Sequence, residues 1–249
     1  MTRKVAIVSG AAQGLGRAFA QRLAAEGYAV LPFDRQESVT DLGNGMIANV
    51  AIRDDVERVI SAACGLGEIE VVINNAGNWR RTPVDCSWEQ ALEDWDFIMD
   101  TNVRGVLLLS RAATPHLIAH GSGHIINIST YYVLPAKSSG TNGPETDLYN
   151  ASKWALNGFT DAWSKTLAAH NIFVNGMCMG ATDTAMLRGL FPDGQLPPGL
   201  EGNLIAVQDL AQQLIDILAS GRTGENFGAW VGETVQLGET PPSHKRITG

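Results

Sequence analysis

The chain has 249 residues with a net charge of −8, and 45% of its residues are hydrophobic and 18% charged. This length suits one large α/β domain or two small ones, and the composition excludes a disordered chain. Nucleic acid is not expected as the main partner, because phosphate binding needs clustered lysines and arginines and no basic run is present.

No membrane partner is expected either, because no apolar run approaches the ~18 residues of a spanning helix. The apolar part of the first residues is also too short for a signal peptide. Three irregularly spaced cysteines, Cys64, Cys86 and Cys178, indicate reduced thiols. We therefore expect a cytoplasmic protein.

The first expected element is a β-branched strand over residues 4–9, which leads directly into a glycine-rich turn. Residues 17–26 follow with apolar side chains at helical spacing. Strand, glycine turn and helix in this order are the context of a dinucleotide-binding fingerprint. The helix start offers unpaired N–H groups and a positive dipole end to a pyrophosphate. The cofactor contacts predicted here are Gly10, Gln13, Gly14, Leu15 and Gly16.

A second strand, expected over residues 29–33, ends in Asp34, which lies 24 residues after Gly10. A carboxylate at this position accepts hydrogen bonds from an adenosine ribose and repels a 2′-phosphate, which favours NAD over NADP. Arg35 argues the other way, since a neighbouring arginine can bind a 2′-phosphate. We expect NAD as the cofactor, with NADP as the alternative.

Strands and helices alternate along the rest of the chain, which predicts a parallel sheet covered on both faces. Further strands are expected over 46–50, 70–75, 123–129, 172–178 and 233–237, and helices over 54–64, within 88–105, and over 107–119, 147–169 and 207–219. Glycines, prolines and apolar residues in 183–203 are typical of a cover over a binding site. Without a repeat or a linker, we expect one domain over residues 1–249, with 183–203 as its cover.

The helix expected over 147–169 carries Tyr149 and Lys153, which lie on one face because they are four residues apart. A tyrosine ordinarily has a pKa of ~10. A neighbouring ammonium stabilises the phenolate and lowers this pKa toward that of a general acid/base. Alone, the pair is equally compatible with an ordinary surface contact, so its meaning depends on the other motifs.

Five motifs follow one another along the chain: Gly10-x-x-x-Gly14-x-Gly16, Asn74-Asn-Ala-Gly77, Asn102, Ile128-Ser129-Thr130 and Tyr149-x-x-x-Lys153. In this order they resemble the short-chain dehydrogenases/reductases, over residues 5 to about 237. The resemblance implies a doubly wound Rossmann-type domain whose parallel seven-stranded sheet has the order 3-2-1-4-5-6-7, with helices on both faces. It also implies a nicotinamide cofactor and a homotetramer or homodimer.

By this resemblance, Tyr149 exchanges a proton with the substrate oxygen while hydride moves to or from the nicotinamide. Lys153 lowers the pKa of Tyr149 and binds the nicotinamide ribose, and Asn102 supports a water that relays protons. Two positions depart from the family pattern, because Met179 replaces a proline and Asn49 replaces an aspartate. Further cofactor contacts implied by the resemblance are Asn49, Val50, Asn75, Ala76, Gly77, Tyr149, Lys153, Gly180, Thr182 and Thr184.

The third catalytic hydroxyl is ambiguous. The family has a serine at the position of Thr130, and Ser129 precedes it. Alternation along a strand sends the two side chains to opposite faces, so only one is expected to reach the substrate. Thr130 is favoured and Ser129 is the alternative. The segment 131–147, before the tyrosine, is several residues longer than in the family, and we expect it to help select the substrate.

The expected function is NAD-dependent interconversion of a secondary alcohol, sugar or other hydroxy compound and its ketone. The alternatives are an NAD-binding regulatory protein without turnover and an epimerase or dehydratase that uses NAD transiently. Arg80, Arg81 and Arg188 could meet an anionic substrate, whereas Tyr131, Tyr132, Leu187 and Phe191 indicate a partly apolar pocket. No metal site is expected, because Gly121 and Gly123 interrupt the helix on which His116, His120 and His124 could share a face.

Overall fold

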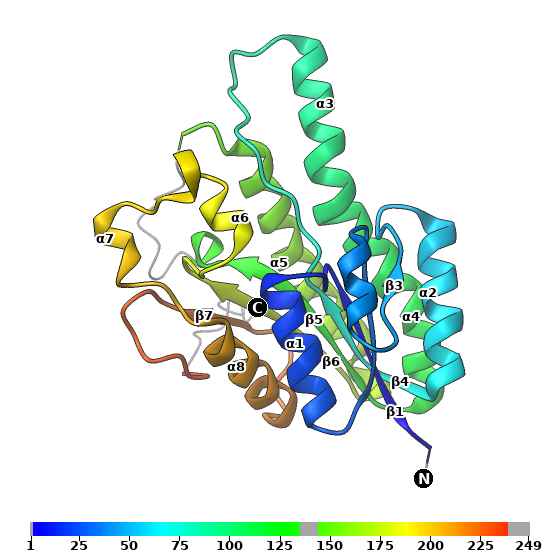
Figure 1. Ribbon diagram of the computed structural model, residues 1–249. Helices are drawn as coiled ribbons and strands as arrows, with labels where there is room; N and C mark the ends of the chain where they lie inside the picture. The colour runs from blue at the N-terminus through cyan, green and yellow to red at the C-terminus, as the bar shows by residue number, and fades with distance from the viewer. Residues whose placement is uncertain (1, 135–143, 239–249) are drawn as a thin grey trace, which may run out of the picture.

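A computed structural model describes residues 2–134 and 144–238, within which seven strands form one parallel sheet of order β3-β2-β1-β4-β5-β6-β7 (Figure 1). The strands are β1 (Lys4–Ser9), β2 (Ala29–Asp34), β3 (Met46–Ile47), β4 (Glu68–Asn74), β5 (Gly123–Thr130), β6 (Ile172–Met179) and β7 (Asn226–Ala229). The helices are α1 (Gly14–Ala25), α2 (Arg53–Leu66), α3 (Trp88–Met99), α4 (Val106–His120), α5 (Asp147–Leu167), α6 (Ala185–Arg188), α7 (Pro198–Glu201) and α8 (Val207–Ala219). This confirms the expected doubly wound fold and its strand order.

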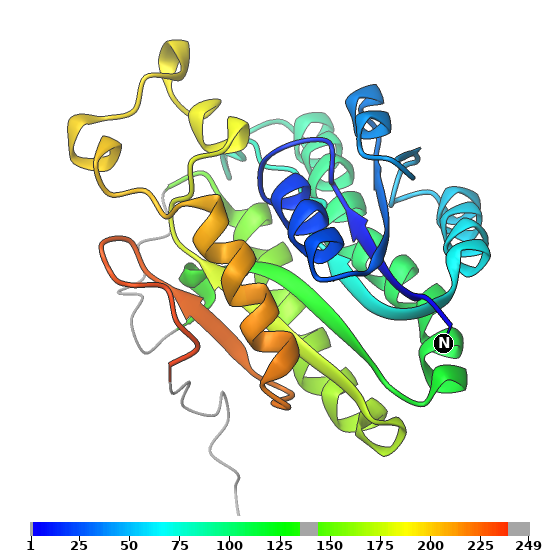
Figure 2. The ribbon, with the colours of Figure 1, turned by 60° about the horizontal axis from the view of Figure 1, so that its bottom comes forward.

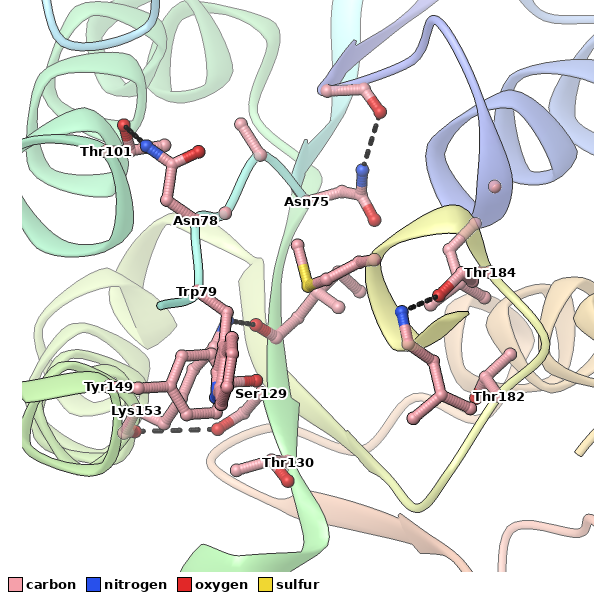
Figure 3. A pocket seen from close by; sticks show the side chains of 18 of the residues that line it. Asn75, Asn78, Trp79, Thr101, Ser129, Thr130, Tyr149, Lys153, Thr182 and Thr184 are labelled. Carbon is pink, nitrogen blue, oxygen red and sulfur yellow. Dashed lines mark hydrogen bonds between the residues drawn. The ribbon is translucent and has the colours of Figure 1, made fainter. Parts of the chain in front are cut away.

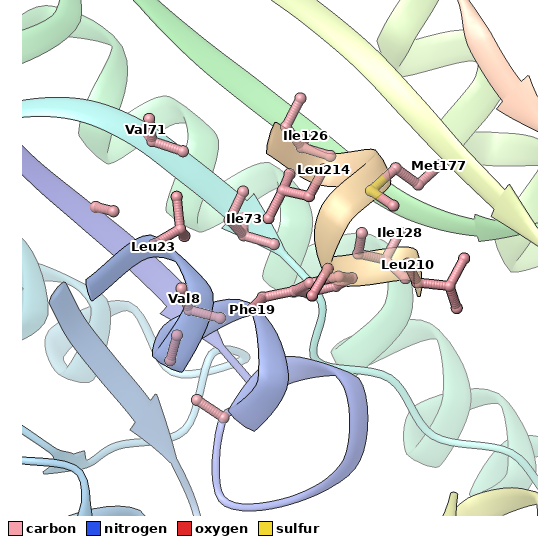
Figure 4. Packing of buried hydrophobic residues seen from close by; sticks show 14 of the residues in the cluster. Val8, Phe19, Leu23, Val71, Ile73, Ile126, Ile128, Met177, Leu210 and Leu214 are labelled. Carbon is pink, nitrogen blue, oxygen red and sulfur yellow. The ribbon is translucent and has the colours of Figure 1, made fainter. Parts of the chain in front are cut away.

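Two hydrophobic clusters, one on each face of the sheet, form the core. On one face α1 and α8 pack side by side, and Figure 2 shows both in front of the strands. Phe19 and Leu23 of α1 meet Leu210 and Leu214 of α8 over β-branched and other aliphatic side chains of the central strands (Figure 4). Helices α2, α4 and α5 cover the other face. Burial on both faces explains why the central strands are almost entirely apolar.

The last strand lies earlier in the chain than the sequence predicted. Strand β7 covers Asn226–Ala229 and pairs in parallel with β6, from Gly176↔Asn226 to Met179↔Ala229. The expectation of a strand over 233–237 is therefore wrong. Val235 and Leu237 are partly buried against the cluster under α8, so their alternation reflects this packing rather than sheet pairing. Strand β3 is also shorter than expected, because the chain leaves the sheet after Ile47.

The strand order creates a crevice at the carboxyl ends of β1 and β4. Here the order reverses, since β2 lies on one side of β1 and β4 on the other. In doubly wound sheets, ligands bind at such a switch point. No helix in the described part of the chain has the length and hydropathy needed to cross a membrane.

Candidate active site

The turn between β1 and α1 is shaped by glycines that admit no side chain. Gly10 has φ +66°, and a Cβ there would lie 2.7 Å from the Ala76 Cα. A Cβ on Gly16 would lie 2.2 Å from the Gly10 carbonyl oxygen. The turn is consequently pressed against the loop after β4, and the first N–H groups of α1 open toward the crevice. These features fit the pyrophosphate of a dinucleotide.

A carboxylate closes the other side of this turn. Asp34, at the end of β2, accepts hydrogen bonds from the backbone N–H groups of Ala12 (3.1 Å) and Gln36 (3.0 Å). Its carboxylate is therefore fixed in place beside the glycine turn. Arg35 is exposed and also lines the crevice.

The loop after β4 is attached to β1 by its first asparagine. The Asn75 amide donates to the carbonyl oxygens of Ser9 (2.9 Å) and Gly10 (3.0 Å), as Figure 3 shows in part. Asn74 instead points into the core, where its amide donates to Ser110 and Asn127, both at 2.9 Å. Asn75 thus shapes the crevice, whereas Asn74 ties β4 to α4 and β5.

A π-helical segment, Asp100–Gly105, joins α3 to α4 without a break. Asn102 lies in this segment and is almost fully buried. Its Oδ1 accepts from the Asn78 N–H (2.7 Å), and its Nδ2 donates to the Asn78 carbonyl (3.0 Å) and to Ser152 Oγ of α5 (3.0 Å). The π-bulge thus lets one amide connect the loop after β4 to α5, an arrangement common at functional sites.

Tyr149 and Lys153 lie together at the start of α5, as their spacing predicted. The Lys153 Nζ is 5.5 Å from the centre of the Tyr149 ring and donates to the Ile128 carbonyl at 2.9 Å. Burial raises the pKa of Tyr149 to about 12 and lowers the pKa of Lys153 to about 8. The sequence predicted that the pKa of Tyr149 would be lowered, and here it is raised. The loss of water around the phenol outweighs the effect of the neighbouring ammonium.

The two hydroxyls at the end of β5 differ in their contacts. Ser129 Oγ donates to the Lys153 carbonyl oxygen at 3.5 Å and lies beside the buried thiol of Cys178. Thr130 is the last residue of the strand, and its hydroxyl makes no hydrogen bond within residues 2–134 and 144–238. Both residues line the crevice, and Figure 3 shows Ser129 beside Lys153 with Thr130 one residue further along.

One cavity of about 490 Å³ connects the glycine turn to Tyr149. Residues 183–203 begin and end at its rim, because Thr182 and Ile205 form a parallel β-bridge and the Ile205 N–H donates to the Ala181 carbonyl (2.9 Å). Within this segment the Thr184 hydroxyl accepts from the Leu187 N–H and starts α6. A Cβ on Gly14 would lie 3.4 Å from the Thr184 methyl group, so the start of this segment reaches across to the glycine turn.

A family model described as short chain dehydrogenase matches residues 4–195. The chain belongs to this family. It is 31% identical over 199 residues to a 3-oxoacyl-[acyl-carrier-protein] reductase of Thermotoga maritima, which covers 75% of this chain and 77% of the relative. A protein of the same description from Synechocystis is 32% identical over 203 residues, covering 76% of this chain and 78% of the relative.

A solved structure of another protein is similar to this short-chain dehydrogenase over nearly its whole length. The crystal structure of a 3-ketoacyl-(acyl-carrier-protein) reductase from Brucella melitensis, complexed with NADH, superposes with a TM-score of 0.78 at 26% identity. The match covers 93% of this chain and 98% of that one. The chain is thus an oxidoreductase of this family, for which a nicotinamide dinucleotide is the expected cofactor.

The cavity of this short-chain dehydrogenase gathers most of the residues singled out from the sequence. Two predicted residues lie outside its lining: Gly16 is behind the turn, and Asn102 lies beneath Asn78. The predicted residues in the lining are Gly10, Gln13, Gly14, Leu15, Asp34, Arg35, Asn49, Val50, Asn75, Ala76, Gly77, Ser129, Thr130, Tyr149, Lys153, Gly180, Thr182 and Thr184. Sequence reasoning missed Asn78, although its place directly after the Asn-Asn-Ala-Gly motif could have indicated it.

The arginines considered for an anionic substrate are engaged elsewhere in this short-chain dehydrogenase. Arg80 donates to Glu93 (3.1 Å) and Asp94 (3.0 Å) and lies over the Phe97 ring. Arg81 pairs with Glu145, and Arg188 forms a two-pronged pair with Asp183 at 2.7 and 2.9 Å. None of the three lines the cavity.

The three histidines of this short-chain dehydrogenase have separate surroundings. His116 Nδ1 contacts the Cys64 thiol at 3.5 Å, and His120 Nδ1 lies 3.1 Å from Glu68. His124 is on β5 and stacks on Phe173. Among the residues that the structure describes, no group of three His, Cys, Asp or Glu side chains could hold a metal ion.

Proposed function

We propose that this protein is an NAD-dependent oxidoreductase that interconverts a secondary alcohol and its ketone, with Tyr149 as the general acid/base. The observation that carries the proposal is the Tyr149–Lys153 pair at the end of a cavity that begins at the glycine turn. Relatives named as reductases of oxoacyl groups support a carbonyl/alcohol pair.

The residues that line the cavity fit a bound dinucleotide. Gly10 and Gly16 leave no room for side chains where the turn is narrowest, and the α1 N-terminus faces the cavity. Asn49, Gly180 and Thr184 would line its path toward Lys153. When bound, the nicotinamide supplies or accepts the hydride. Residues 183–203 would form the cover over it, held at their two ends by the Thr182–Ile205 bridge.

The protonation state of Tyr149 suits the reductive direction. With a pKa of about 12, the phenol carries its proton at neutral pH and can donate it to the oxygen of a ketone as hydride reaches the carbon. The charged Lys153 nearby then stabilises the resulting phenolate. The balanced reaction is ketone, NADH and a proton giving alcohol and NAD⁺, and Tyr149 regains its proton from solvent through the groups around Asn102.

The test of this proposal is a turnover screen. We expect NADH oxidation with ketones, and NAD⁺ reduction with the matching alcohols, across a panel of aromatic and steroid ketones, sugars and hydroxy acids. Tight NADH binding without net turnover of any compound would instead indicate a regulatory protein, and product formation without net NADH change would indicate an epimerase or dehydratase.

Asp34 is expected to decide the choice between NAD and NADP. A 2′-phosphate beside this fixed carboxylate would be repelled, so we expect kcat/KM to be about 10²-fold higher with NADH than with NADPH. Asp34→Asn removes the charge at nearly constant shape and should shrink this ratio. Asp41→Asn, an exposed carboxylate outside the cavity lining, is the control. An unchanged ratio in Asp34→Asn would contradict the assignment.

Thr130 is proposed as the third catalytic hydroxyl, because it lines the cavity while the Ser129 hydroxyl contacts Lys153 and Cys178. Replacing it by valine keeps the shape and removes the hydrogen bond to the substrate oxygen. We expect Thr130→Val to lower kcat by about 10²–10³-fold, as for loss of an oxyanion donor, and Ser129→Ala to be mild. Steady-state kinetics with the reverse pattern would move the role to Ser129.

A homo-oligomer is proposed from the surface of α3. Trp88, Leu92 and Trp95 form one apolar stripe and are 82%, 63% and 50% exposed, and Figure 1 shows α3 standing out from the body of the molecule. A second copy of the chain would cover this stripe. We expect a dimer or tetramer by light scattering and a smaller species for Trp88→Glu. Ile52→Glu, at a 48% exposed position directly before α2, should leave the mass unchanged. A monomeric wild type would contradict the proposal.

The free thiols at Cys64, Cys86 and Cys178 are consistent with a reducing compartment such as the cytoplasm, which we propose as the site of action.

A further inference from the structure

The cavity is lined by aromatic and aliphatic side chains, and the aromatic ones form a wall at its Tyr149 end. They come from three separate segments, and they are Trp79 from the loop after β4, Tyr131 and Tyr132 from the turn after β5, and Met186, Leu187 and Leu190 from residues 183–203. Met186 is 46% and Leu190 37% exposed. Apolar side chains gathered at a cavity mouth in this way mark a place where an apolar ligand removes them from water.

The aromatic wall of this end is fixed from behind. The rings of Tyr131 and Tyr132 lie with their centres 4.5 Å apart, and Trp230 meets the Tyr131 ring edge-on at 5.8 Å. Gly180 directly follows β6, and a Cβ on it would lie 3.4 Å from the Tyr131 ring. The end of β6 therefore also supports this ring. A wall held in this way offers a flat ligand a stacking surface without first having to be ordered.

The arginines near this end are already paired with carboxylates of this chain. Among the described residues that line the cavity, the charged ones are Asp34 and Arg35 at the glycine-turn end, and Lys153. Arg80, Arg81 and Arg188, in the flanking segments, each bind a carboxylate of this chain. Among the described residues, a carboxylate or phosphate on the substrate would therefore lose its water without gaining any cation besides Lys153, which is costly.

We propose that the substrate is an uncharged ketone or secondary alcohol whose reactive carbon bears a flat aromatic or alicyclic group. This rests on the proposed function and narrows it to a substrate class. The flat group would stack between Trp79 and Tyr131, with Met186 and Leu190 over it, while the oxygen faces Tyr149. A 3-oxoacyl group on an acyl-carrier protein, which the names of two relatives describe, does not match these surroundings.

The experiment is titration calorimetry of the NAD⁺-loaded protein with ketones that cannot be oxidised in that complex. The ligands are acetophenone, its anionic analogue 4-acetylbenzoate, the small ketone 2-butanone, and acetoacetyl-coenzyme A. We expect acetophenone to bind about tenfold more tightly than each of the others, a difference of about 1.4 kcal/mol. Binding of 4-acetylbenzoate or acetoacetyl-coenzyme A as tight as that of acetophenone overturns the inference.

Two variants of Leu190 and one control variant test whether acetophenone binds in this pocket. Leu190→Arg places a cation at the mouth and should reverse part of the discrimination against 4-acetylbenzoate. Leu190→Ala should weaken acetophenone binding severalfold, whereas Ile118→Ala, at a similarly exposed position on α4, should not. Equal affinities in Leu190→Ala and Ile118→Ala would contradict the assignment of the pocket.

The affinities of the four ketones can be measured whether or not the proposed reaction occurs. Preferential acetophenone binding without reduction by NADH would leave this inference standing and remove the proposed function. Reduction of acetophenone together with equal affinity for the anionic ketones would do the opposite.

Discussion

Tyr149→Phe is expected to lower kcat for ketone reduction by about 10²–10⁴-fold, the contribution of a positioned general acid. The phenylalanine keeps the ring and its packing beside Lys153 but has no proton to give to the substrate oxygen. Affinity for NADH should stay as in the wild type, because the glycine turn and Asp34 are untouched. Stopped-flow single-turnover rates and fluorescence titration of NADH measure the two quantities separately.

The control for this variant is Tyr28→Phe, a phenol at the opposite end of the sheet that hydrogen-bonds Glu70 (3.2 Å). It should leave kcat unchanged. Near-normal turnover in Tyr149→Phe would exclude Tyr149 as the acid and redirect attention to Tyr131 or Tyr132, which line the same cavity.

Lys153→Met is expected to lower kcat by about 10²-fold, the effect of a unit charge acting over ~5 Å in a medium of effective dielectric ~20.

In the wild type, the pH profile of kcat should also show an alkaline limb, in which the rate falls as the pH rises. Because burial lowers the pKa of Lys153 to about 8, its ammonium is present below this pH and lost above it. Stabilisation of the phenolate is lost with it, so ketone reduction should slow as the pH rises through about 8.

Lys153→Arg gives the matched control, since a guanidinium keeps its charge throughout this range. Both variants should lack the limb near pH 8, the methionine variant because it has no charge and the arginine variant because its charge does not titrate. A pH profile of kcat in Lys153→Met that retains the wild-type limb would show that another group titrates there.

The fold could be predicted because the sheet and the helices on its faces each produce a short-range pattern of apolar residues in the sequence. Apolar runs such as Val5–Val8 reflect burial on both faces of the sheet, and the spacing in Val207–Ala219 matches the helix found there. The last strand escaped prediction because Val235 and Leu237 pack on the core without pairing. Alternation of apolar residues reports burial on one side, and it does not distinguish a paired strand from an extended segment.

The candidate site was predictable to the extent that its residues lie at the carboxyl ends of parallel strands. Asp34, Asn75 and Thr130 meet in one crevice for this reason. What short-range patterns could not show are partners distant along the chain. Arg81 meets a carboxylate 64 residues away, and this pairing removes it as a candidate for substrate binding. The raised pKa of Tyr149 was missed for a related cause, since burial depends on the complete tertiary structure.

The central claim is direct hydride transfer to a ketone with protonation by Tyr149. The measurement that tests it most directly uses NADH carrying deuterium on either face of nicotinamide C4, with acetophenone as substrate and mass spectrometry of the product. We predict deuterium on the carbinol carbon of 1-phenylethanol from one of the two labelled cofactors, and almost none with Tyr149→Phe. Alcohol formed without deuterium from either cofactor, or labelled product formed equally fast by Tyr149→Phe, would contradict the claim.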